Sequence, residues 1–466
     1  MQMVDVVVVG AGPVGENVAG RVVEGGLTAL VVEAELVGGE CSYWACMPSK
    51  ALLRPIHALR AATRVAGSRE AATGSIDVAA VLARRDSFTS GMDDAGQVSW
   101  LEGAGIGLVR GHGRLVGERR VDVTGPDGRV VEIEARVAVV LATGSTATVP
   151  PVPGLREAAP WTSREATTAS QVPGRLVVMG AGVVGLEMAQ AWHGLGSEVV
   201  VLERGGRLLP RLEPFAGELL ADQLREDGVD LRFGSTVVRV ERTGASGPVT
   251  VHLADGGSVT GDELLVAAGR SPASTDLGLD VVGLEPGAYV PVDDSMRVDG
   301  VPWLHATGDV NGRALLTHQG KYQARVCGDA IVARSRGGEP SYLAEADDAM
   351  VPQVMFTDPE IASVGLTEAG AAERGLRTRT VAYDIGSVAG GALHADDYRG
   401  RACLVVDEDR GVVVGATFVG QDVADLLHSA TVAVVGEVPL TRLRHAVPSY
   451  PTMSEVWLRL LEAYGL

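Results

Sequence analysis

The chain has 466 residues, of which 46% are hydrophobic and 21% charged, and its formal net charge is −19. This length exceeds what one hydrophobic core supports, so we expect several domains of a soluble globular protein. The acidic balance argues against nucleic acid or an anionic membrane as a partner, because phosphate groups require a basic surface. No apolar run reaches the about 20 residues of a membrane helix and no signal peptide is visible, so we expect a cytoplasmic protein.

The first predicted unit is a buried strand followed by a glycine-rich turn. Residues 4–9 read Val-Asp-Val-Val-Val-Val, which is typical of a strand covered on both faces in a parallel sheet. The turn reads Gly-Ala-Gly-Pro-Val-Gly, and a second strand at residues 29–32 ends in an acid. In a dinucleotide-binding unit such glycines admit the pyrophosphate at a helix N-terminus, and the acid accepts a hydrogen bond from a ribose hydroxyl. The predicted contact residues are Gly10, Gly12, Pro13, Gly15 and Glu33.

A closely spaced pair of cysteines follows, because residues 38–50 read Gly-Gly-Glu-Cys-Ser-Tyr-Trp-Ala-Cys-Met-Pro-Ser-Lys. Cys41 and Cys46 would be too distant for a disulfide on one ideal helix, so we expect Cys41 in a loop and Cys46 in the first helical turn. A helix N-terminus stabilises a thiolate. In a chain with four cysteines, a close pair is more typical of catalysis than of a structural disulfide. We expect Cys327 and Cys403 to be buried as small apolar residues.

The strand and glycine pattern recurs in the middle of the chain. A strand at residues 176–179 leads into Gly-Ala-Gly-Val-Val-Gly, and a strand at residues 199–202 ends in an acid at the same spacing as in the first unit. Two such units imply two bound dinucleotides. The predicted contact residues of the second unit are Gly180, Gly182, Gly185, Glu203 and Gly269.

These motifs and their order resemble the class I pyridine nucleotide–disulfide oxidoreductases, which include dihydrolipoyl dehydrogenase and the glutathione, mycothione and mercuric reductases. The resemblance implies an α/β fold with two Rossmann-like dinucleotide-binding domains, for FAD and NAD(P), and a C-terminal α+β dimerisation domain. It implies an FAD-binding domain at 1–148 and 271–345, an NAD(P)-binding domain at 149–270 and an interface domain at 346–466. It also implies a homodimer in which the partner subunit completes each active site.

The resemblance assigns roles to individual residues. Cys46 would face the flavin and Cys41 would be the interchange thiol that attacks the substrate. Lys50 would pair with Glu187 near flavin N5. Electrons would pass from NAD(P)H through FAD to the disulfide and then to a small-molecule acceptor. Further FAD contacts would come from Gly39, Ser145 and Asp309.

The acid of the second unit bears on the choice of nicotinamide cofactor. The carboxylate of Glu203 accepts from a ribose 2′-hydroxyl and repels a 2′-phosphate, so we expect NADH to be preferred over NADPH. Arg204 and Arg207 oppose this prediction, because either guanidinium can bind a 2′-phosphate.

One position departs from the family pattern. The disulfide reductases carry His-Pro-Thr-x-x-Glu near the C-terminus, and residues 450–455 here read Tyr-Pro-Thr-Met-Ser-Glu. Tyr450 therefore stands where the family has its acid–base histidine, while Glu455 matches. A phenol has a pKa near ~10 and does not readily accept a thiol proton at pH 7. His445 is an alternative acid–base group.

Several functions remain open. The first is a reductase of disulfides or other acceptors that works through the dithiol. The second is a flavin-level NAD(P)H:quinone reductase or small-molecule dehydrogenase with secondary cysteines, in which Tyr43 and Trp44 either select a flat acceptor or pack on the flavin. Mercuric reductases share the tyrosine but have a C-terminal cysteine pair that residues 462–466 lack, so mercuric reduction is less favoured. A non-catalytic redox flavoprotein is disfavoured because both nucleotide units are intact, and no metal site is expected.

Overall fold

A computed structural model describes residues 2–244 and 246–466. The chain forms two compact units, each assembled from separated stretches of sequence. The first unit comprises residues 1–48, 85–148 and 269–348, and the second comprises 49–84, 149–268 and 349–466. No helix among the described residues combines the length and the apolar character that crossing a membrane would take.

The first unit is built on a mixed sheet in the order β3-β2-β1-β6-β5-β4, with β16 also paired to β6. Strands β1, β2, β3 and β16 pair in parallel, whereas β4, β5 and β6 form an antiparallel meander. A short antiparallel pair, β7 with β15, lies in the same unit. The strands are β1 (Gln2–Val9), β2 (Ala29–Glu33), β3 (Gly107–Arg110), β4 (His112–Gly117), β5 (Arg120–Thr124), β6 (Val130–Leu141), β7 (Ser145–Ala147), β15 (Arg270–Pro272) and β16 (Leu304–Ala306).

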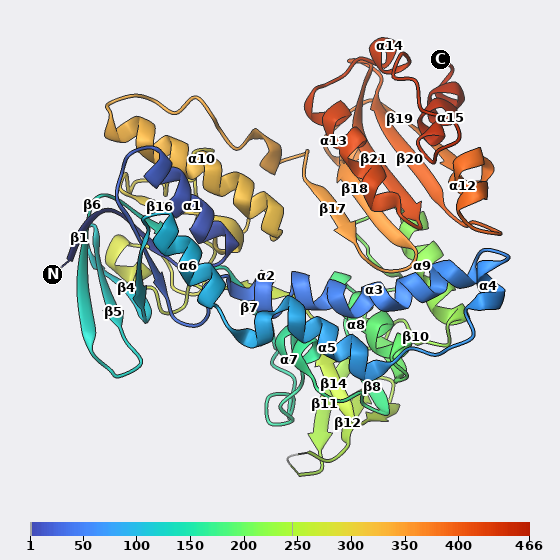
Figure 1. The fold of residues 1–466 in the computed structure, drawn as a ribbon, viewed down its shortest axis with the longest axis horizontal. Coiled ribbons are helices and arrows are strands. Elements are labelled where there is room, and N and C mark those ends of the chain that lie inside the picture. The colour runs from blue at the N-terminus through green and yellow to red at the C-terminus, as the bar shows by residue number, and fades with distance from the viewer. Residues whose placement is uncertain (1, 245) are drawn as a thin grey trace. The chain divides into compact units, whose positions relative to one another are not determined.

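Helices α1 (Pro13–Glu24) and α10 (Thr317–Ser335) lie side by side in the first unit (Figure 1). Small residues allow the close approach, because a Cβ added to Gly328 would lie only 2.7 Å from the Cβ of Arg21. The apolar face of α1 packs into a core that also contains residues of β1, β2 and α10. This unit further contains α2 (Gly39–Tyr43), α6 (Ala95–Gly103), η2 (Leu279–Val282) and η3 (Gly308–Asn311).

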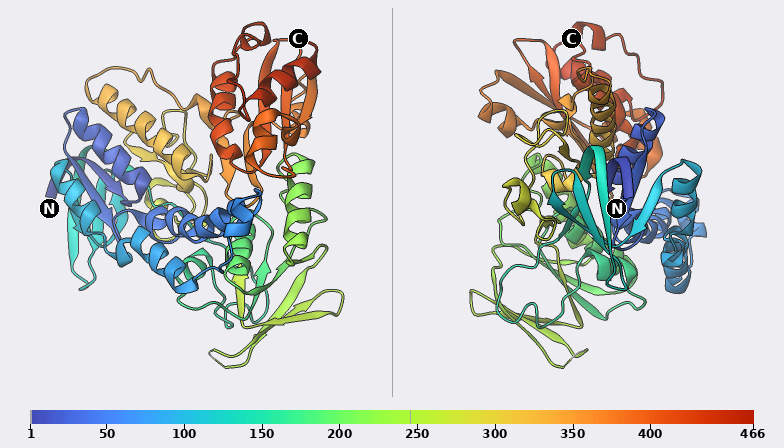
Figure 2. Two further views of the ribbon diagram at one scale, coloured as in Figure 1. Left: turned by 45° about the vertical axis from the view of Figure 1, so that its right-hand side comes forward. Right: turned by 90° about the vertical axis from the view of Figure 1, so that its left-hand side faces the viewer.

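The second unit holds a parallel sheet in the order β10-β9-β8-β14 and two antiparallel sheets. One is β11-β12-β13, the yellow-green strands of Figure 2, and the other is β17-β18-β21-β20-β19. The strands are β8 (Arg175–Met179), β9 (Glu198–Leu202), β10 (Asp230–Arg232), β11 (Val237–Arg242), β12 (Val249–Leu253), β13 (Ser258–Gly261), β14 (Glu263–Val266), β17 (Pro352–Met355), β18 (Glu360–Gly365), β19 (Thr378–Asp384), β20 (Arg401–Asp407) and β21 (Val412–Gly420).

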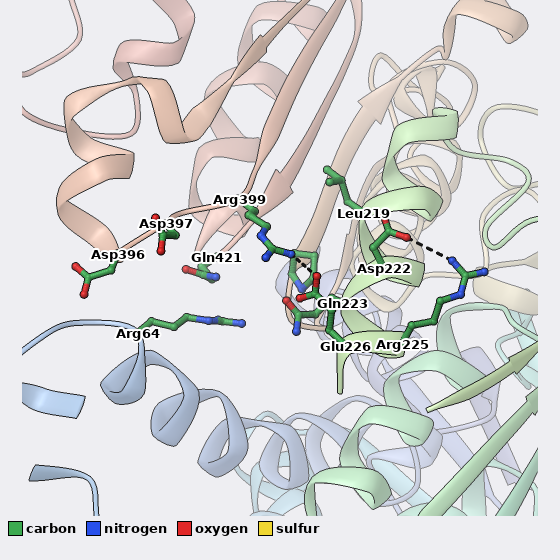
Figure 3. Close-up of a pocket in the computed structure, with 11 residues that line it drawn as sticks. Arg64, Leu219, Asp222, Gln223, Arg225, Glu226, Asp396, Asp397, Arg399 and Gln421 are labelled. Atoms are coloured by element: carbon green, nitrogen blue, oxygen red, sulfur yellow. Dashed lines mark hydrogen bonds and ion pairs between the residues drawn. The ribbon is translucent and has the colours of Figure 1, made fainter. Parts of the chain in front are cut away.

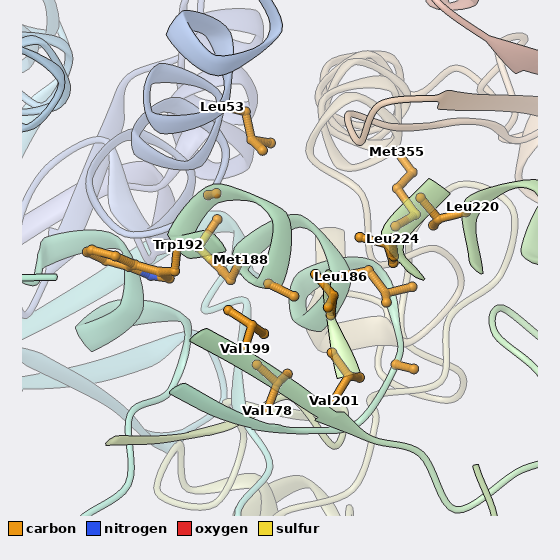
Figure 4. Packing of buried hydrophobic residues seen from close by; sticks show 14 of the residues in the cluster. Leu53, Val178, Leu186, Met188, Trp192, Val199, Val201, Leu220, Leu224 and Met355 are labelled. Carbon is orange, nitrogen blue, oxygen red and sulfur yellow. The ribbon is translucent and has the colours of Figure 1, made fainter. Parts of the chain in front are cut away.

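Helix α8 (Val183–Gly194) is the buried centre of the second unit. Leu186, Met188 and Trp192 of this helix pack against valines of β8 and β9 (Figure 4). The indole of Trp192 is fully buried and donates a hydrogen bond to the carbonyl of Ala166 at 3.2 Å, which satisfies its polar atom. A helix buried on most sides is a rigid support for any functional side chain that it carries.

The other helices of the second unit cover its sheets. α13 packs on β18 and β21, and α15 packs on β19 and β20. The helices are α4 (Ser68–Ala71), α7 (Ser163–Thr168), α9 (Pro214–Glu226), α11 (Glu368–Glu373), α12 (Ala389–His394), α13 (Leu427–Val435), α14 (Leu440–Leu443) and α15 (Glu455–Tyr464). Two further helices are α3 (Cys46–Thr63) and α5 (Val78–Phe88). Each of them begins in one compact unit and ends in the other.

Candidate active site

Cys41 and Cys46 lie on two consecutive helices. α2 carries Cys41 and ends at Tyr43, the next residue Trp44 has a non-helical φ of −130°, and Cys46 is the first residue of α3. The expectation of a loop around Cys41 is therefore wrong, whereas the placement of Cys46 at a helix start is confirmed. Both cysteines are half-buried. Because the helix is interrupted between them, the two cysteines do not have the spacing of one continuous helix, which would hold them too far apart for a disulfide.

A threonine from a distant part of the sequence lies beside the second thiol. Thr317 is the first residue of α10, and its Oγ1 lies 3.4 Å from the Sγ of Cys46. A hydroxyl can donate to a thiolate or accept from a thiol. The separation of 271 positions along the chain explains why no sequence pattern pointed to Thr317.

The two aromatic residues between the cysteines differ in their surroundings. Tyr43 is 1% exposed and its hydroxyl donates to the carbonyl of Val37 at 3.1 Å. Burial raises the pKa of the Tyr43 phenol to about 12. Trp44 is half-buried and contacts Tyr43 edge-on, with ring centroids 5.7 Å apart. Tyr43 is thus tied into the interior of the first unit, and only Trp44 keeps substantial exposed surface.

The first glycine turn forms a cradle at the start of α1. Gly10 has a φ of +102°, and a Cβ there would lie 2.5 Å from the carbonyl oxygen of Ala142. Gly12 is the N-cap of α1 and provides no side-chain cap, so the first helical N–H groups remain available for an anion. A Cβ on Gly39 would lie 2.8 Å from the Cα of Gly12, so the backbone at position 39 leaves no room for a side chain. Pro13 and Gly15 complete the predicted cradle, and the arrangement fits the pyrophosphate of FAD.

Two carboxyl groups lie at this cradle. Glu33 accepts hydrogen bonds from the backbone N–H groups of Ala11 at 2.7 Å and Glu35 at 2.8 Å. Burial raises the pKa of Glu33 despite these bonds. Glu16, in the first turn of α1, has a buried Oε1 that makes no hydrogen bond, and burial raises its pKa to about 7. Sequence reasoning missed Glu16, because an acid in the first turn of a helix is common.

Ser145 and Asp309, the other predicted FAD contacts, lie together. The hydroxyl of Ser145 donates a hydrogen bond to the carboxylate of Asp309 and accepts one from Arg270 Nε at 2.6 Å. Arg270 also donates to the carbonyl of Ser145 at 2.5 Å. Asp309 lies inside η3, whose N-cap is Thr307, so it is not the N-cap of that helix. These contacts bring three separate segments of the first unit to one point.

The second glycine turn repeats the geometry of the first. Gly180 has a φ of +107° and Gly182 is the N-cap of α8 without a side-chain cap. A Cβ on Gly185 would lie 2.1 Å from the carbonyl oxygen of Gly180, so the helix and the turn are in contact. Gly269, which follows β14, has a φ of +123°. The N-terminus of α8 is therefore a second anion site that fits a pyridine nucleotide.

Glu203 is held in the same manner as Glu33. Its Oε2 accepts from Ala181 N at 3.0 Å and its Oε1 accepts from Gly205 N at 2.5 Å. Arg207 is exposed and donates to the carbonyl of Pro210 at 2.6 Å. The carboxylate of Glu203, the predicted ribose contact, is thus oriented by backbone N–H groups of nearby residues.

The predicted pair of Lys50 and Glu187 is present in the second unit. Lys50 Nζ lies 2.7 Å from Oε2 of Glu187, which is 3% exposed. The other oxygen, Oε1, accepts from the backbone N–H of Phe356 at 2.9 Å, and the ring of Phe356 lies 4.9 Å from Lys50 Nζ. The buried carboxylate therefore has a partner on each oxygen, as burial of a charge requires. No sequence pattern pointed to Phe356.

In the part of the chain that the structure describes, no hydrogen bond joins Tyr450 or His445 to Glu455. Tyr450 is 78% exposed, and His445 is also exposed. The carboxylate of Glu455, at the start of α15, accepts from Gly390 N at 3.3 Å instead of from the phenol of Tyr450. Neither acid–base candidate is thus joined to Glu455 within one chain.

A charged cavity of about 610 Å³ lies elsewhere in the second unit (Figure 3). Its arginines are engaged by acids, since Arg399 pairs with Glu226 at 2.5 Å and Arg225 pairs with Asp222 at 3.3 Å. None of the predicted site residues lines it. Among the described residues there is also no cluster of three or more histidine, cysteine or acidic side chains that could hold a metal ion.

Family comparisons cover nearly the whole chain. Residues 4–330 match the pyridine nucleotide-disulphide oxidoreductase family, and residues 351–460 match the dimerisation domain of the same family. The mercuric reductase of Bacillus cereus is 31% identical over 457 residues, which cover 97% of this chain and 70% of that protein. The dihydrolipoyl dehydrogenase of Thermus scotoductus is 31% identical over 470 residues, which cover 99% and 98%.

Solved structures agree with this fold. The crystal structure of LpdA from Mycobacterium tuberculosis has a TM-score of 0.85 and 25% sequence identity, with all of both chains covered. The HOCl-induced flavoprotein disulfide reductase RclA of Escherichia coli has a TM-score of 0.83 at 23% identity, which shows a shared fold. The architecture of two Rossmann-like domains and a dimerisation domain is thereby confirmed. The dithiol segment, the two nucleotide cradles and these matches together make the chain a member of the pyridine nucleotide–disulphide oxidoreductases, enzymes that use FAD and a pyridine nucleotide.

Proposed function

We propose that this enzyme passes electron pairs from NADH through FAD to the Cys41–Cys46 disulfide, and from the dithiol to a small acceptor that needs no proton from residue 450. The observation that carries the proposal is the position of Cys46. It begins α3 with the hydroxyl of Thr317 at 3.4 Å, in a unit that also contains the first glycine cradle. A sulfur at a helix N-terminus with a hydroxyl beside it suits a thiolate.

Each cofactor has a set of binding residues in this proposal. FAD, when bound, supplies the hydride chemistry that links the nicotinamide to the disulfide. Its cradle consists of Gly10, Gly12, Pro13, Gly15, Glu33, Gly39, Ser145 and Asp309. The nicotinamide nucleotide is held by Gly180, Gly182, Gly185, Glu203 and Gly269. A preference for NADH is supported by the carboxylate of Glu203, which two backbone N–H groups hold in one orientation and which would accept from a ribose 2′-hydroxyl.

After two-electron reduction of the disulfide, the two cysteines have different roles. Cys46 keeps its negative charge beside the flavin, with the Thr317 hydroxyl as a hydrogen-bond donor. Cys41 is the thiol that attacks the acceptor. Lys50, held by Glu187 at 2.7 Å, would supply a positive charge to the bound FAD.

The nature of the acceptor follows from the acid–base position. Disulfide reduction needs a group that protonates the departing thiolate, and Tyr450 is a poor base. Because Tyr450 is 78% exposed in one chain, it suits a site that the partner subunit of a homodimer completes. Acceptors that react with thiolates without a departing thiol, or that take electrons as a quinone does, avoid this requirement. We place the enzyme in the cytoplasm, where the dithiol would be kept reducible.

An acceptor screen tests the proposal. NADH oxidation is followed with lipoamide, glutathione disulfide, a quinone and mercuric ion, for the wild type and for Cys41→Ser. We expect turnover with the preferred acceptor to be lost in Cys41→Ser while FAD binding remains. Full activity of Cys41→Ser with every acceptor rules out transfer through the dithiol.

The second candidate function is quinone reduction directly from the flavin. It is favoured by Trp44, a half-buried indole between the cysteines that offers a flat apolar surface. In that case Cys41→Ser retains quinone turnover, whereas Trp44→Ala raises the KM for the quinone severalfold.

A further inference from the structure

The turn between β17 and β18 is held by a side chain of α8. The backbone N–H of Asp358 donates to Oε1 of Gln190 at 2.7 Å, and Nε2 of Gln190 donates back to the carbonyl of Asp358 at 2.9 Å. Gln190 is 0% exposed and Asp358 is 4% exposed. One buried amide thus satisfies both backbone polar groups of one residue, which fixes the turn in place.

The same turn contacts the ion pair described above. Phe356 donates its N–H to Glu187 at 2.9 Å, and its ring lies 4.9 Å from the ammonium of Lys50. Glu187 and Gln190 are three residues apart on α8 and therefore share a helix face. Gln190 consequently determines where Phe356 can lie relative to Glu187.

The carboxylate of Asp358 ties the turn to the helix that carries Lys50. Its Oδ2 lies 3.8 Å from Arg60, which is on α3, and 2.7 Å from Arg64, which directly follows the end of α3 at Thr63. Arg60 is held in turn by Asp227 at 2.7 Å. Figure 3 shows Arg64 among the residues that line the charged cavity. The turn, α3 and α8 are therefore joined by charge as well as by backbone hydrogen bonds.

We propose that Gln190 is a positioning residue: by gripping Asp358 it holds Phe356 where its N–H and ring orient the Glu187–Lys50 pair. This inference rests on the proposed function, in which Lys50 acts beside the flavin. Glu187 is a buried anion that depends on one cation and one N–H group, so displacement of Phe356 changes the direction in which Lys50 points. A misplacement of about 1 Å in a reacting group can cost about a hundredfold in rate.

The first test replaces Gln190 with methionine, which keeps the length of the side chain and removes both hydrogen bonds. Met188→Leu is the matched control, because Met188 lies on the same helix at 1% exposure and touches none of these groups through a hydrogen bond. We expect reduction of the holoenzyme by NADH to slow about tenfold to a hundredfold in Gln190→Met. Met188→Leu is expected to stay within about twofold of the wild type, since the swap conserves volume.

A second readout does not depend on activity. Hydrogen exchange of the amides of Phe356 and Asp358 should accelerate in Gln190→Met and remain slow in Met188→Leu, because both amides are hydrogen-bonded to α8 side chains. Gln190→Glu keeps an acceptor for the Asp358 amide and loses the donor, so an intermediate effect is expected if Gln190→Met folds poorly. Wild-type exchange and wild-type rates in both Gln190 variants overturn the inference.

A double-mutant cycle with Glu187→Gln separates positioning from general stability. If Gln190 acts through Glu187, adding Gln190→Met to Glu187→Gln slows the enzyme no further. If Gln190→Met acts independently, the double variant is slowed by the product of the two single effects. Multiplied effects therefore overturn the inference. If Glu187→Gln and Lys50→Met are both as fast as the wild type, the proposed role of the ion pair fails. If they are slow and Gln190→Met is normal, only the positioning role fails.

Discussion

The Sγ of Cys46 lies 3.4 Å from the Oγ1 of Thr317, and these two residues are the first residues of α3 and α10. Two helix N-termini therefore meet at one sulfur. Each N-terminus carries the positive end of a helix dipole and unsatisfied N–H groups. This meeting point is a favourable environment for a negatively charged sulfur, and it gives the proposed function its first measurable consequence.

Two-electron reduction of the holoenzyme should produce a long-wavelength absorbance band from the Cys46 thiolate against the flavin. Cys46→Ser should abolish this band while FAD stays bound at about one per chain, because the serine hydroxyl stays protonated. Absorbance spectra during anaerobic titration with NADH check this. A band that persists in Cys46→Ser refutes the assignment of Cys46 as the flavin-facing thiol.

Thr317→Val should weaken the same band severalfold at neutral pH. The substitution preserves shape and removes a hydrogen bond to a charged sulfur, an interaction of about 1.5–3 kcal/mol. Thr317→Ser retains the hydroxyl and serves as the control, with a band close to that of the wild type. Equal band intensities in the valine and serine variants would mean that the hydroxyl does not stabilise the thiolate.

NADH should have a higher kcat/KM than NADPH, because the carboxylate of Glu203, held by Ala181 N and Gly205 N, stands at the position predicted to accept from a ribose hydroxyl. Glu203→Gln should narrow the difference by removing the charge that repels a 2′-phosphate. Steady-state kinetics with both cofactors decide the matter. A higher kcat/KM for NADPH in the wild type would indicate that Arg204 or Arg207, and not Glu203, determines which cofactor binds.

Turnover of lipoamide and glutathione disulfide should be slow in the wild type, and Tyr450→His should raise it. A positioned acid–base group contributes about 10²–10⁴-fold, and Glu455 is available to orient a histidine ring. His445→Gln is the informative companion variant. Brisk disulfide turnover that His445→Gln eliminates would show that His445 already serves as the acid–base group.

Stability should fall in acid through His305, which β16 buries with neither ring nitrogen hydrogen-bonded. Burial lowers its pKa from 6.5 to about 3. Between these values the unfolded chain binds a proton that the folded chain excludes, so stability decreases as the pH falls from about 6.5 toward 3.

His305→Phe should reduce that pH dependence, by up to about 1.4 kcal/mol per pH unit for one proton. Denaturant unfolding at a series of pH values measures the slope. His445→Gln provides the comparison, as a histidine substitution at an exposed position. An unchanged slope in His305→Phe would assign the acid sensitivity to other groups.

The sequence was sufficient for features that are local. The strands that end at Glu33 and Glu203 and the glycine turns before α1 and α8 follow from hydrophobic runs and spacing, and the structure has them at the expected places. Cys327 and Cys403 are buried as expected, at 0% and 2% exposed. Such features are encoded within about thirty residues, over which the hydrophobic periodicity and the glycine turns can be recognised in the sequence.

Contacts between distant segments were beyond the sequence pattern. The pairing of Lys50 with Glu187 came from family resemblance, and the parts played by Thr317, Phe356 and Gln190 came from packing alone. The helix around Cys41 was missed because five residues are too few to show a helical period, and it begins directly after Gly38, whose φ is +111°. The division into FAD, NAD(P) and interface domains stays an interpretation alongside the two compact units.

Gly390 allows the backbone of the C-terminal segment around Thr452 to pack closely against α12. A Cβ on this residue of α12 would lie 1.9 Å from the carbonyl carbon of Thr452, so the backbone two residues beyond Tyr450 rests against α12 with no room for a methyl group. This contact between Gly390 and the backbone of Thr452 does not depend on which side chain stands at position 450. A substitution at position 450 is therefore expected to change the acid–base group that this segment offers while the path of the backbone stays the same.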